Sequence, residues 1–245
     1  MTLEAPLELP SFEAFEHLLE RPGPWLAGMD CPFAQPRKLI ENLNLPRSWP
    51  EYVAYFSSLG RDGFVAALEA YKAPRRDGDK EHRRAVDTMA KSISPQKLYG
   101  VPVGKMFFEA ARRLLDSPLN VPLLRETDDN RTVLEAYPKL VVQACVGSVS
   151  YKADDRAKQT EMHRANRKAI VDRLLESVAL DVYGVEVDID ASDAGAMVDD
   201  PSGDRLDALL CAVQTAWACR SPNHGIPGGV DALEGWIVDP CLGLS

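Results

Sequence analysis

Apolar residues recur at helical spacing in several stretches of the chain, and short apolar runs of strand length lie between them. The predicted helices span 11–20, 36–44, 49–58, 61–72, 105–117, 138–146, 154–178 and 203–220. The predicted strands span 25–30, 120–124 and 132–138. Alternating strands and helices predict an α/β protein, although the strands are few for a chain of 245 residues.

Length and composition set the broad class. The 245 residues suit one large α/β domain, and no repeat, low-complexity segment or linker divides 1–245. No apolar run approaches the roughly 18 residues that a membrane-spanning helix needs, and the acidic N-terminus lacks the features of a signal peptide. The five cysteines are scattered and form no C-x-x-C pair, which favours reduced thiols. We therefore predict a cytoplasmic protein with no membrane partner.

The net charge of −9 argues against broad, non-specific binding to nucleic acid, because phosphate contacts need clustered Lys and Arg. Two stretches depart from this balance. Residues 72–91 and 151–173 each hold seven Lys or Arg against four Asp or Glu. The simplest interpretation is a solvated surface, and the alternative is a local basic groove that guides a phosphate backbone.

Three acids lie in or beside apolar elements, where an unpaired carboxylate is costly to bury. Asp30 ends the first strand, Glu135 lies within the strand 132–138, and Asp207 lies at the edge of the apolar face of the last helix, three residues after Asp204. Structural explanations stay open for each acid. Asp204 could serve the helix dipole, Asp30 could form a turn, and Glu135 could pair with Arg131 or another cation.

Together, these acids suggest hard-cation chemistry. Carboxylates that converge from strand ends and one helix make an oxygen-rich site of the kind that Mg²⁺ or Mn²⁺ prefers. Two such ions about 4 Å apart can activate a water molecule and stabilise the leaving oxygen of a phosphodiester. The sequence alone does not show that the acids converge.

Six ordered blocks carry a resemblance to a known family, over about Phe15 to Pro240. The blocks are GMDCPFAQPR, SPQKLYGVPVGKMFFEAARRLL, RTVLEAYPKL, SYK, SGDRLDALLCAVQTAW and ALEGWIVDP. The chain resembles the DUF429 family, whose members are described as predicted ribonuclease H-like nucleases. The resemblance implies a mixed sheet flanked by helices, with acids that bind divalent metal.

The resemblance also implies roles for individual residues. The implied catalytic residues are Asp30, Glu135 and Asp207, the implied Mg²⁺ or Mn²⁺ ligands are Asp30, Glu135, Asp204 and Asp207, and the implied phosphate contacts are Arg37, Arg131 and Lys152. Members of the family usually open with an earlier strand that carries a further acid. Here only about 25 residues precede the strand that ends at Asp30, and they predict a helix. Either the start codon is assigned too far downstream or the chain lacks those strands, and the sheet is then incomplete at its N-terminal side.

The leading functional hypothesis is a divalent-metal-dependent nuclease that hydrolyses phosphodiester bonds in nucleic acid. The alternative is a non-catalytic module that keeps the ribonuclease H-like fold and binds nucleic acid or protein. Phosphoryl chemistry on a small molecule ranks lowest, because glycine-rich phosphate loops are scarce before residue 225. The sequence leaves open the oligomeric state and the substrate, whether DNA, RNA, a branched junction or a nucleotide.

Overall fold

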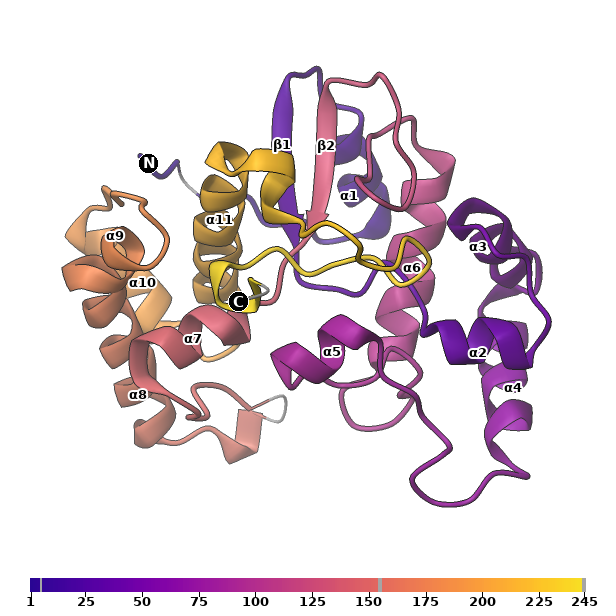
Figure 1. The fold of residues 1–245 in the computed structure, drawn as a ribbon. Coiled ribbons are helices and arrows are strands. Elements are labelled where there is room, and N and C mark those ends of the chain that lie inside the picture. Colours follow the sequence, from indigo (N-terminus) through magenta and orange to yellow (C-terminus); the bar gives the residue numbers. More distant parts are fainter. Residues whose placement is uncertain (5, 154–155, 244–245) are drawn as a thin grey trace.

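Two parallel strands form the sheet, which stands between α11 (Asp204–Arg220) and α6 (Val103–Asp116) in the upper part of Figure 1. A computed structural model describes residues 1–4, 6–153 and 156–243 of the chain. Strand β1 (Trp25–Met29) pairs with β2 (Arg131–Glu135), with Trp25 opposite Arg131 and Met29 opposite Glu135. Both strands lie where the apolar runs predict them, and the chain is an α/β protein with a small parallel sheet flanked by helices.

The outer edge of β2 pairs with short segments rather than with a third full strand. Residues 120–124 form only isolated bridges, from Asn120 to Thr132 and from Val121 to Arg125. Pro122 has no amide hydrogen to donate, and Leu123 has a φ of 72°, so an extended strand cannot continue through them. Further along this edge, the amide of Val238 donates to the carbonyl of Glu135 at 2.9 Å.

Helix α11 (Asp204–Arg220) packs closely on one face of β1. The contact is made at Gly28, where an added Cβ would lie 2.1 Å from Oγ1 of Thr215 and 3.2 Å from the carbonyl oxygen of Cys211. Only glycine allows this approach of strand and helix. The contact places the first turns of α11 beside the end of β1.

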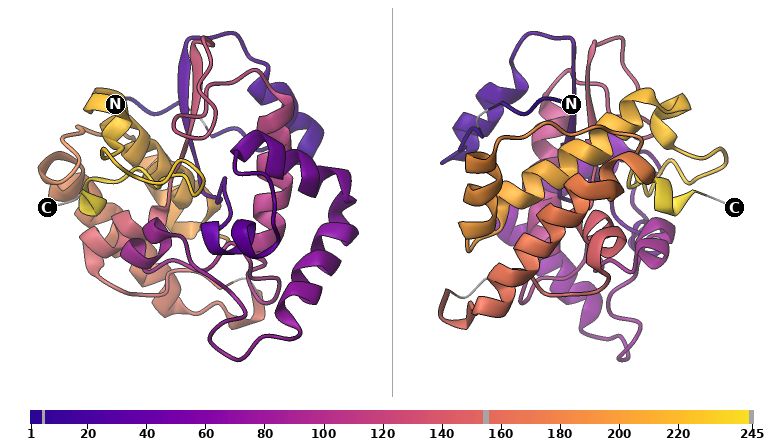
Figure 2. Two further views of the ribbon diagram at one scale, coloured as in Figure 1. Left: turned by 45° about the vertical axis from the view of Figure 1, so that its right-hand side comes forward. Right: turned by 90° about the vertical axis from the view of Figure 1, so that its left-hand side faces the viewer.

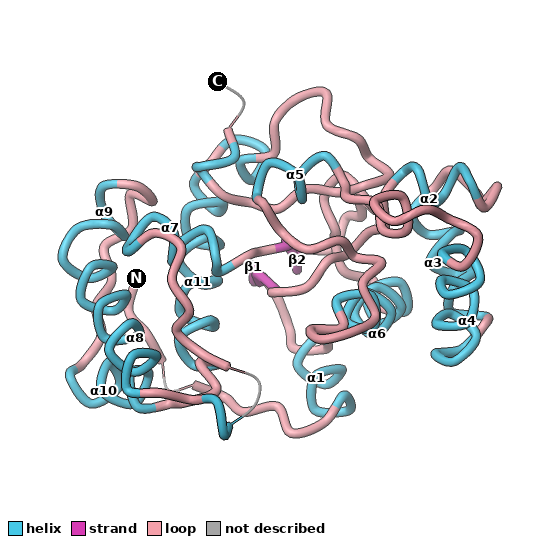
Figure 3. The backbone as a smooth tube through the Cα atoms, turned by 90° about the horizontal axis from the view of Figure 1, so that it is seen from below, coloured by secondary structure: helices cyan, strands magenta, loops and turns pink. Residues whose placement is uncertain are grey.

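The opposite face of β1 packs against a helical layer built around aromatic residues. This layer contains α1 (Phe12–Leu19), α2 (Arg37–Asn42), α3 (Trp49–Ser58), α4 (Gly60–Lys72) and α6 (Val103–Asp116). The ring of Phe56 meets those of Phe64 and Phe107 edge-on, with centroids 5.1 and 6.2 Å apart. Seen from below, the two strands lie end-on between α11 and α6 (Figure 3).

A second group of helices packs around α11 and forms its own apolar core (Figure 2). It contains α7 (Pro138–Val146), α8 (Glu161–Arg173), a π-helical turn at Leu174–Val178, α9 (Ala179–Asp181) and α10 (Ala191–Asp199). The predicted helix 154–178 begins only at Glu161 as an α-helix, because the Thr160 hydroxyl caps it by accepting from the amide of His163. Residues 154 and 155 of that prediction lie outside the described residues.

Short elements complete the described chain. Helix α5 (Ala85–Ala90) lies within the basic stretch 72–91, near its end, and 3₁₀ turns span Arg156–Lys158, Pro222–Gly225 and Pro240–Leu242. Over the described ranges, none of the helices combines the length and the apolar character that crossing a lipid bilayer requires.

Candidate active site at the strand ends

The strands bring two of the predicted acids to one edge of the sheet. Asp30 directly follows β1, and Glu135 is the last residue of β2, opposite Met29. Parallel strands present their carboxyl ends at the same edge, which is where α/β proteins commonly place their sites. Asp207 reaches this edge from the first turn of α11, and its carboxylate and that of Glu135 both raise the pKa of Asp30. The structure therefore gathers Asp30, Glu135 and Asp207 into one cluster of side chains, and we use the name carboxylate cleft for this cluster.

Asp30 is the acid of the cleft that lacks a partner: among the described residues, no hydrogen bond or ion pair satisfies its carboxyl group. The Asp30 residue is exposed to solvent, although atoms of neighbouring residues surround its carboxyl group. Desolvation, followed by repulsion from Asp207, raises its pKa to about 7, while the ammonium of Lys152 opposes the rise. Asp30 therefore titrates near neutral pH.

Glu135 is buried and is held by Arg84. The Arg84 guanidinium donates to both carboxylate oxygens at 2.6 and 2.8 Å, and the amide of Phe33 donates to Oε2 at 3.1 Å. On its other side Arg84 donates to the two oxygens of Asp87 at 2.8 and 2.9 Å. Burial raises the pKa of Glu135, and the Arg84 charge acts against that rise. Glu135 thus does pair with a cation, but the cation is Arg84 rather than Arg131.

Asp207 is held by two adjacent residues of the block SYK. The Tyr151 hydroxyl donates to Oδ1 at 2.5 Å, and the Lys152 ammonium donates to Oδ2. Burial raises the pKa of Asp207, and Lys152 lowers it. Lys152 also lies 3.8 Å from Asp204, whose side chain is 80% exposed at the start of α11. Asp204 thus lies at the rim of the cleft, where it also favours the positive end of the helix dipole.

The predicted phosphate contacts are distributed unevenly. Lys152 lies at the carboxylate cleft, as described. Arg37 donates to both oxygens of Asp231 at 2.5 and 2.6 Å, so its guanidinium is engaged elsewhere. Arg131 donates to Asp129. It is the first residue of β2, four residues before Glu135, so the two lie about 13 Å apart along the strand. Only Lys152 among the three is beside the acids.

The cleft fits a hard cation in part. Within the described ranges, no group of three or more His, Cys, Asp and Glu side chains lies close enough together to hold a metal ion as those side chains stand. Asp30 and Asp207 offer carboxylate oxygens, the donors that Mg²⁺ and Mn²⁺ prefer, and the Lys152 ammonium already supplies positive charge there. Glu135 fits less well as a direct ligand, because Arg84 occupies both of its oxygens.

Sequence reasoning missed three polar residues that organise the site. Arg84 belongs to the basic stretch 72–91, and nothing in that stretch distinguishes this buried arginine from its exposed neighbours. Tyr151 lies in the block SYK, and its hydroxyl could have been recognised as a partner for a buried acid. Asp239 is buried, accepts from Tyr183 at 2.9 Å and from Gln214 at 2.5 Å, and follows Val238, whose amide donates to the carbonyl of Glu135.

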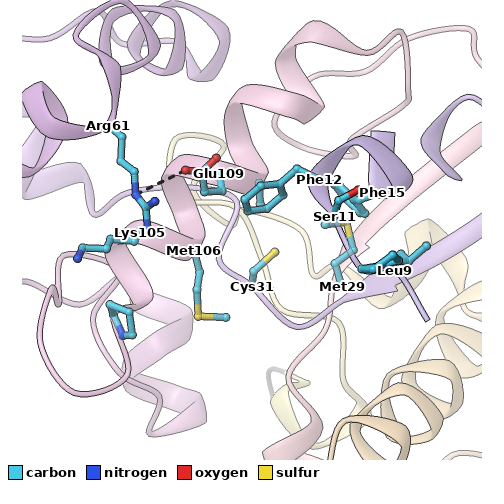
Figure 4. Close-up of a pocket in the computed structure, with 13 residues that line it drawn as sticks. Leu9, Ser11, Phe12, Phe15, Met29, Cys31, Arg61, Lys105, Met106 and Glu109 are labelled. Carbon is cyan, nitrogen blue, oxygen red and sulfur yellow. Dashed lines mark ion pairs between the residues drawn. The ribbon is translucent and has the colours of Figure 1, made fainter. Parts of the chain in front are cut away.

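A separate groove lies on the α1 and α6 side of the strand end (Figure 4). It has a volume of about 630 Å³, and Phe12, Met29, Cys31 and Met106 contribute to its mostly apolar lining. Arg61 and Glu109 face one another across its rim at 3.7 Å. The side chain of Asp30 is not part of this lining.

The fold and the cleft together define a class: a helix-rich α/β protein with acids at the carboxyl ends of two parallel strands and on a neighbouring helix. A family model described as "Protein of unknown function (DUF429)" matches residues 2–229. The chain belongs to this family, as the six sequence blocks indicate. No curated protein and no solved structure matches the chain.

Proposed function

We propose that the protein is a divalent-metal-dependent phosphodiesterase that acts on nucleic acid, with the carboxylate cleft as its active site. One observation carries the proposal: the carboxyl group of Asp30 has no hydrogen-bond partner among the described residues and lies within electrostatic range of Asp207. An acid that is desolvated, repelled by a second acid and left unpartnered is typical of a functional site. A cation bound between the two carboxylates would relieve that repulsion.

In this proposal Asp30 and Asp207 hold Mg²⁺ or Mn²⁺, and Asp204 contributes charge from the rim. The metal, when bound, supplies an activated water and stabilises the leaving oxygen. Tyr151 fixes the orientation of Asp207, and Lys152 neutralises the cleft and offers a contact for the phosphate. The ion pair of Glu135 with Arg84 holds the end of β2 in place beside Asp30. The acids at the ends of parallel strands and on a later helix are compatible with a ribonuclease H-like arrangement.

The test compares cleavage by matched variants. Asp30→Asn and Asp207→Asn should each abolish Mn²⁺-dependent hydrolysis of labelled DNA and RNA, while circular dichroism shows an unchanged helix content. Asp128→Asn, which removes an exposed acid near the opposite end of β2, should cleave like the parent. Undiminished cleavage by Asp207→Asn would remove that residue from the mechanism.

A second candidate function is a non-catalytic binding module with the same fold. The engagement of Glu135 by Arg84 favours it, because one of the three acids is then withheld from a metal. Calorimetric titration with Mn²⁺ separates the two functions. Binding that is lost in Asp30→Asn supports the phosphodiesterase, and no binding by the parent protein supports the module.

A further inference from the structure

A polar groove of about 620 Å³ lies beside α5, apart from the residues of the carboxylate cleft. Polar and charged side chains make up most of its lining, which includes Lys38, Asp79, Glu81, Arg83, Lys97 and Tyr99. These residues come from α2 and from the loops on either side of α5. The groove thus contains part of the basic stretch 72–91.

Both acids of this groove form ion pairs with cations, whereas two of its cations form no ion pair with an acid. Asp79 accepts from Lys38 at 2.6 Å and from Arg75 at 2.7 Å. Glu81 accepts from Lys72 at 3.0 Å. Arg83 and Lys97, by contrast, form no ion pair with any described acid. The groove therefore presents uncompensated positive charge, which attracts an anion.

An exposed aromatic ring accompanies these cations. Tyr99 is 66% exposed, and the Lys97 ammonium lies 5.1 Å from the centroid of its ring. Most of the Tyr99 side chain is open to solvent, so its ring is available for stacking. A ring next to unpaired cations suits a base stacked on the ring, with its phosphates on the cations.

Helix α5 connects the groove to the carboxylate cleft. Thr88 of this helix lines the groove, whereas Asp87 pairs with Arg84, which reaches Glu135. The neighbouring residues Arg83 and Arg84 therefore serve different sides: Arg83 lines the groove, and Arg84 lies under the cleft.

We propose that this groove binds a single strand of nucleic acid, with a base stacked on Tyr99 and phosphates on Arg83 and Lys97. Binding of the strand is argued from the groove alone. Only the further step, that the bound strand is the substrate of the carboxylate cleft, rests on the proposed function. Single-stranded nucleic acid fits better than a duplex, because a side-chain ring can stack only on a base that is not already stacked between neighbours.

Fluorescence anisotropy in EDTA tests binding without cleavage. Labelled (dT)₂₀ and (rU)₂₀ should bind more tightly than a 20-base-pair duplex. Stacking on one base predicts that Tyr99→Ala weakens binding by about 5- to 150-fold, while Tyr99→Phe keeps it. Arg83→Gln and Lys97→Gln should each reduce the slope of log K against log salt by about 0.7.

The matched control is Lys168→Gln on α8, whose side chain is exposed and pairs with Asp172 at 2.6 Å. It should bind like the parent. The groove assignment is overturned if Tyr99→Ala binds like the parent, if the duplex is preferred, or if neither oligonucleotide binds. Because Tyr99 is exposed, its truncation should not unfold the protein, and a melting curve of each variant checks this.

The same samples distinguish the groove from the proposed function. In one outcome Asp30→Asn still binds the single strand in EDTA and the parent shows no Mn²⁺-dependent cleavage. This outcome supports the groove and contradicts the phosphodiesterase. In the other outcome the parent and Tyr99→Ala cleave (dT)₂₀ equally well. This outcome supports the phosphodiesterase and contradicts the groove.

Discussion

Replacing Asp30 by Asn should stabilise the protein at alkaline pH. The pKa of Asp30 rises from 3.8, its ordinary value, to about 7 in the folded protein. Between these two pH values the folded protein keeps a proton that the unfolded chain releases. The free energy of unfolding therefore falls as the pH rises through this window, and the loss is complete above about pH 7. Asn carries no ionisable group, so the variant escapes this loss.

The size of the effect follows from the shift and from the exposure of the side chain. A shift from 3.8 to about 7, at about 1.4 kcal/mol per unit, sets an upper limit of about 4 kcal/mol. Because the Asp30 residue is exposed, solvent screening reduces this figure, and we expect about 1–2 kcal/mol. For a chain of this size that corresponds to about 2 to 8 °C in melting temperature.

The assay is a thermal melt of the parent and Asp30→Asn at pH 4.5 and pH 8.5. The advantage of the variant should widen between the two pH values, and Asp128→Asn should show no such widening. Added Mn²⁺ should stabilise the parent more than Asp30→Asn at pH 8.5. A difference between parent and Asp30→Asn that stays constant with pH would refute the reasoning that Asp30 is a desolvated and repelled acid.

Three further substitutions test the surroundings of the cleft. Arg84→Met leaves two buried carboxylates without their cation and should lower the free energy of unfolding by about 3–5 kcal/mol in a urea titration. Gly28→Ala forces a Cβ against the Thr215 hydroxyl and should cost about 1–3 kcal/mol in the same titration, with partial recovery in the double variant with Thr215→Ala. Lys152→Gln removes the cation that lowers the pKa of Asp30 and should move that titration to higher pH, measured by carbon-13 NMR of the carboxyl group.

Each of these predictions has a matched control and a contrary outcome. Arg164→Gln breaks an exposed pair with Asp199 and should leave the urea midpoint unchanged. An equally stable Arg84→Met would show that the buried ion pairs contribute nothing net. Full stability of Gly28→Ala would mean that α11 can move away from β1. An unchanged pKa of Asp30 in Lys152→Gln would mean that the Lys152 charge does not influence Asp30.

Local patterns in the sequence determined most elements near the cleft. The run at 25–30 predicts β1, the run at 132–138 predicts β2, and the stripe of the last helix predicts α11, which spans Asp204–Arg220. Local pattern suffices here because a short apolar run or a helical apolar stripe marks the residues that pack against neighbouring elements. Helix α10 escaped prediction, since its small and acidic residues form no apolar stripe and only Asp190 marks its start.

The sequence by itself also singled out Asp30, Glu135 and Asp207, because an acid beside apolar residues is costly wherever the chain folds. Tertiary structure alone decided what each acid contacts. Parallel pairing places Asp30 beside Glu135 across more than 100 intervening residues, and the close contact at Gly28 brings Asp207 to them. Arg84, rather than the nearby Arg131, neutralises Glu135 because β2 carries Arg131 to its opposite end. Partners distant along the chain are chosen by packing, which local spacing does not encode.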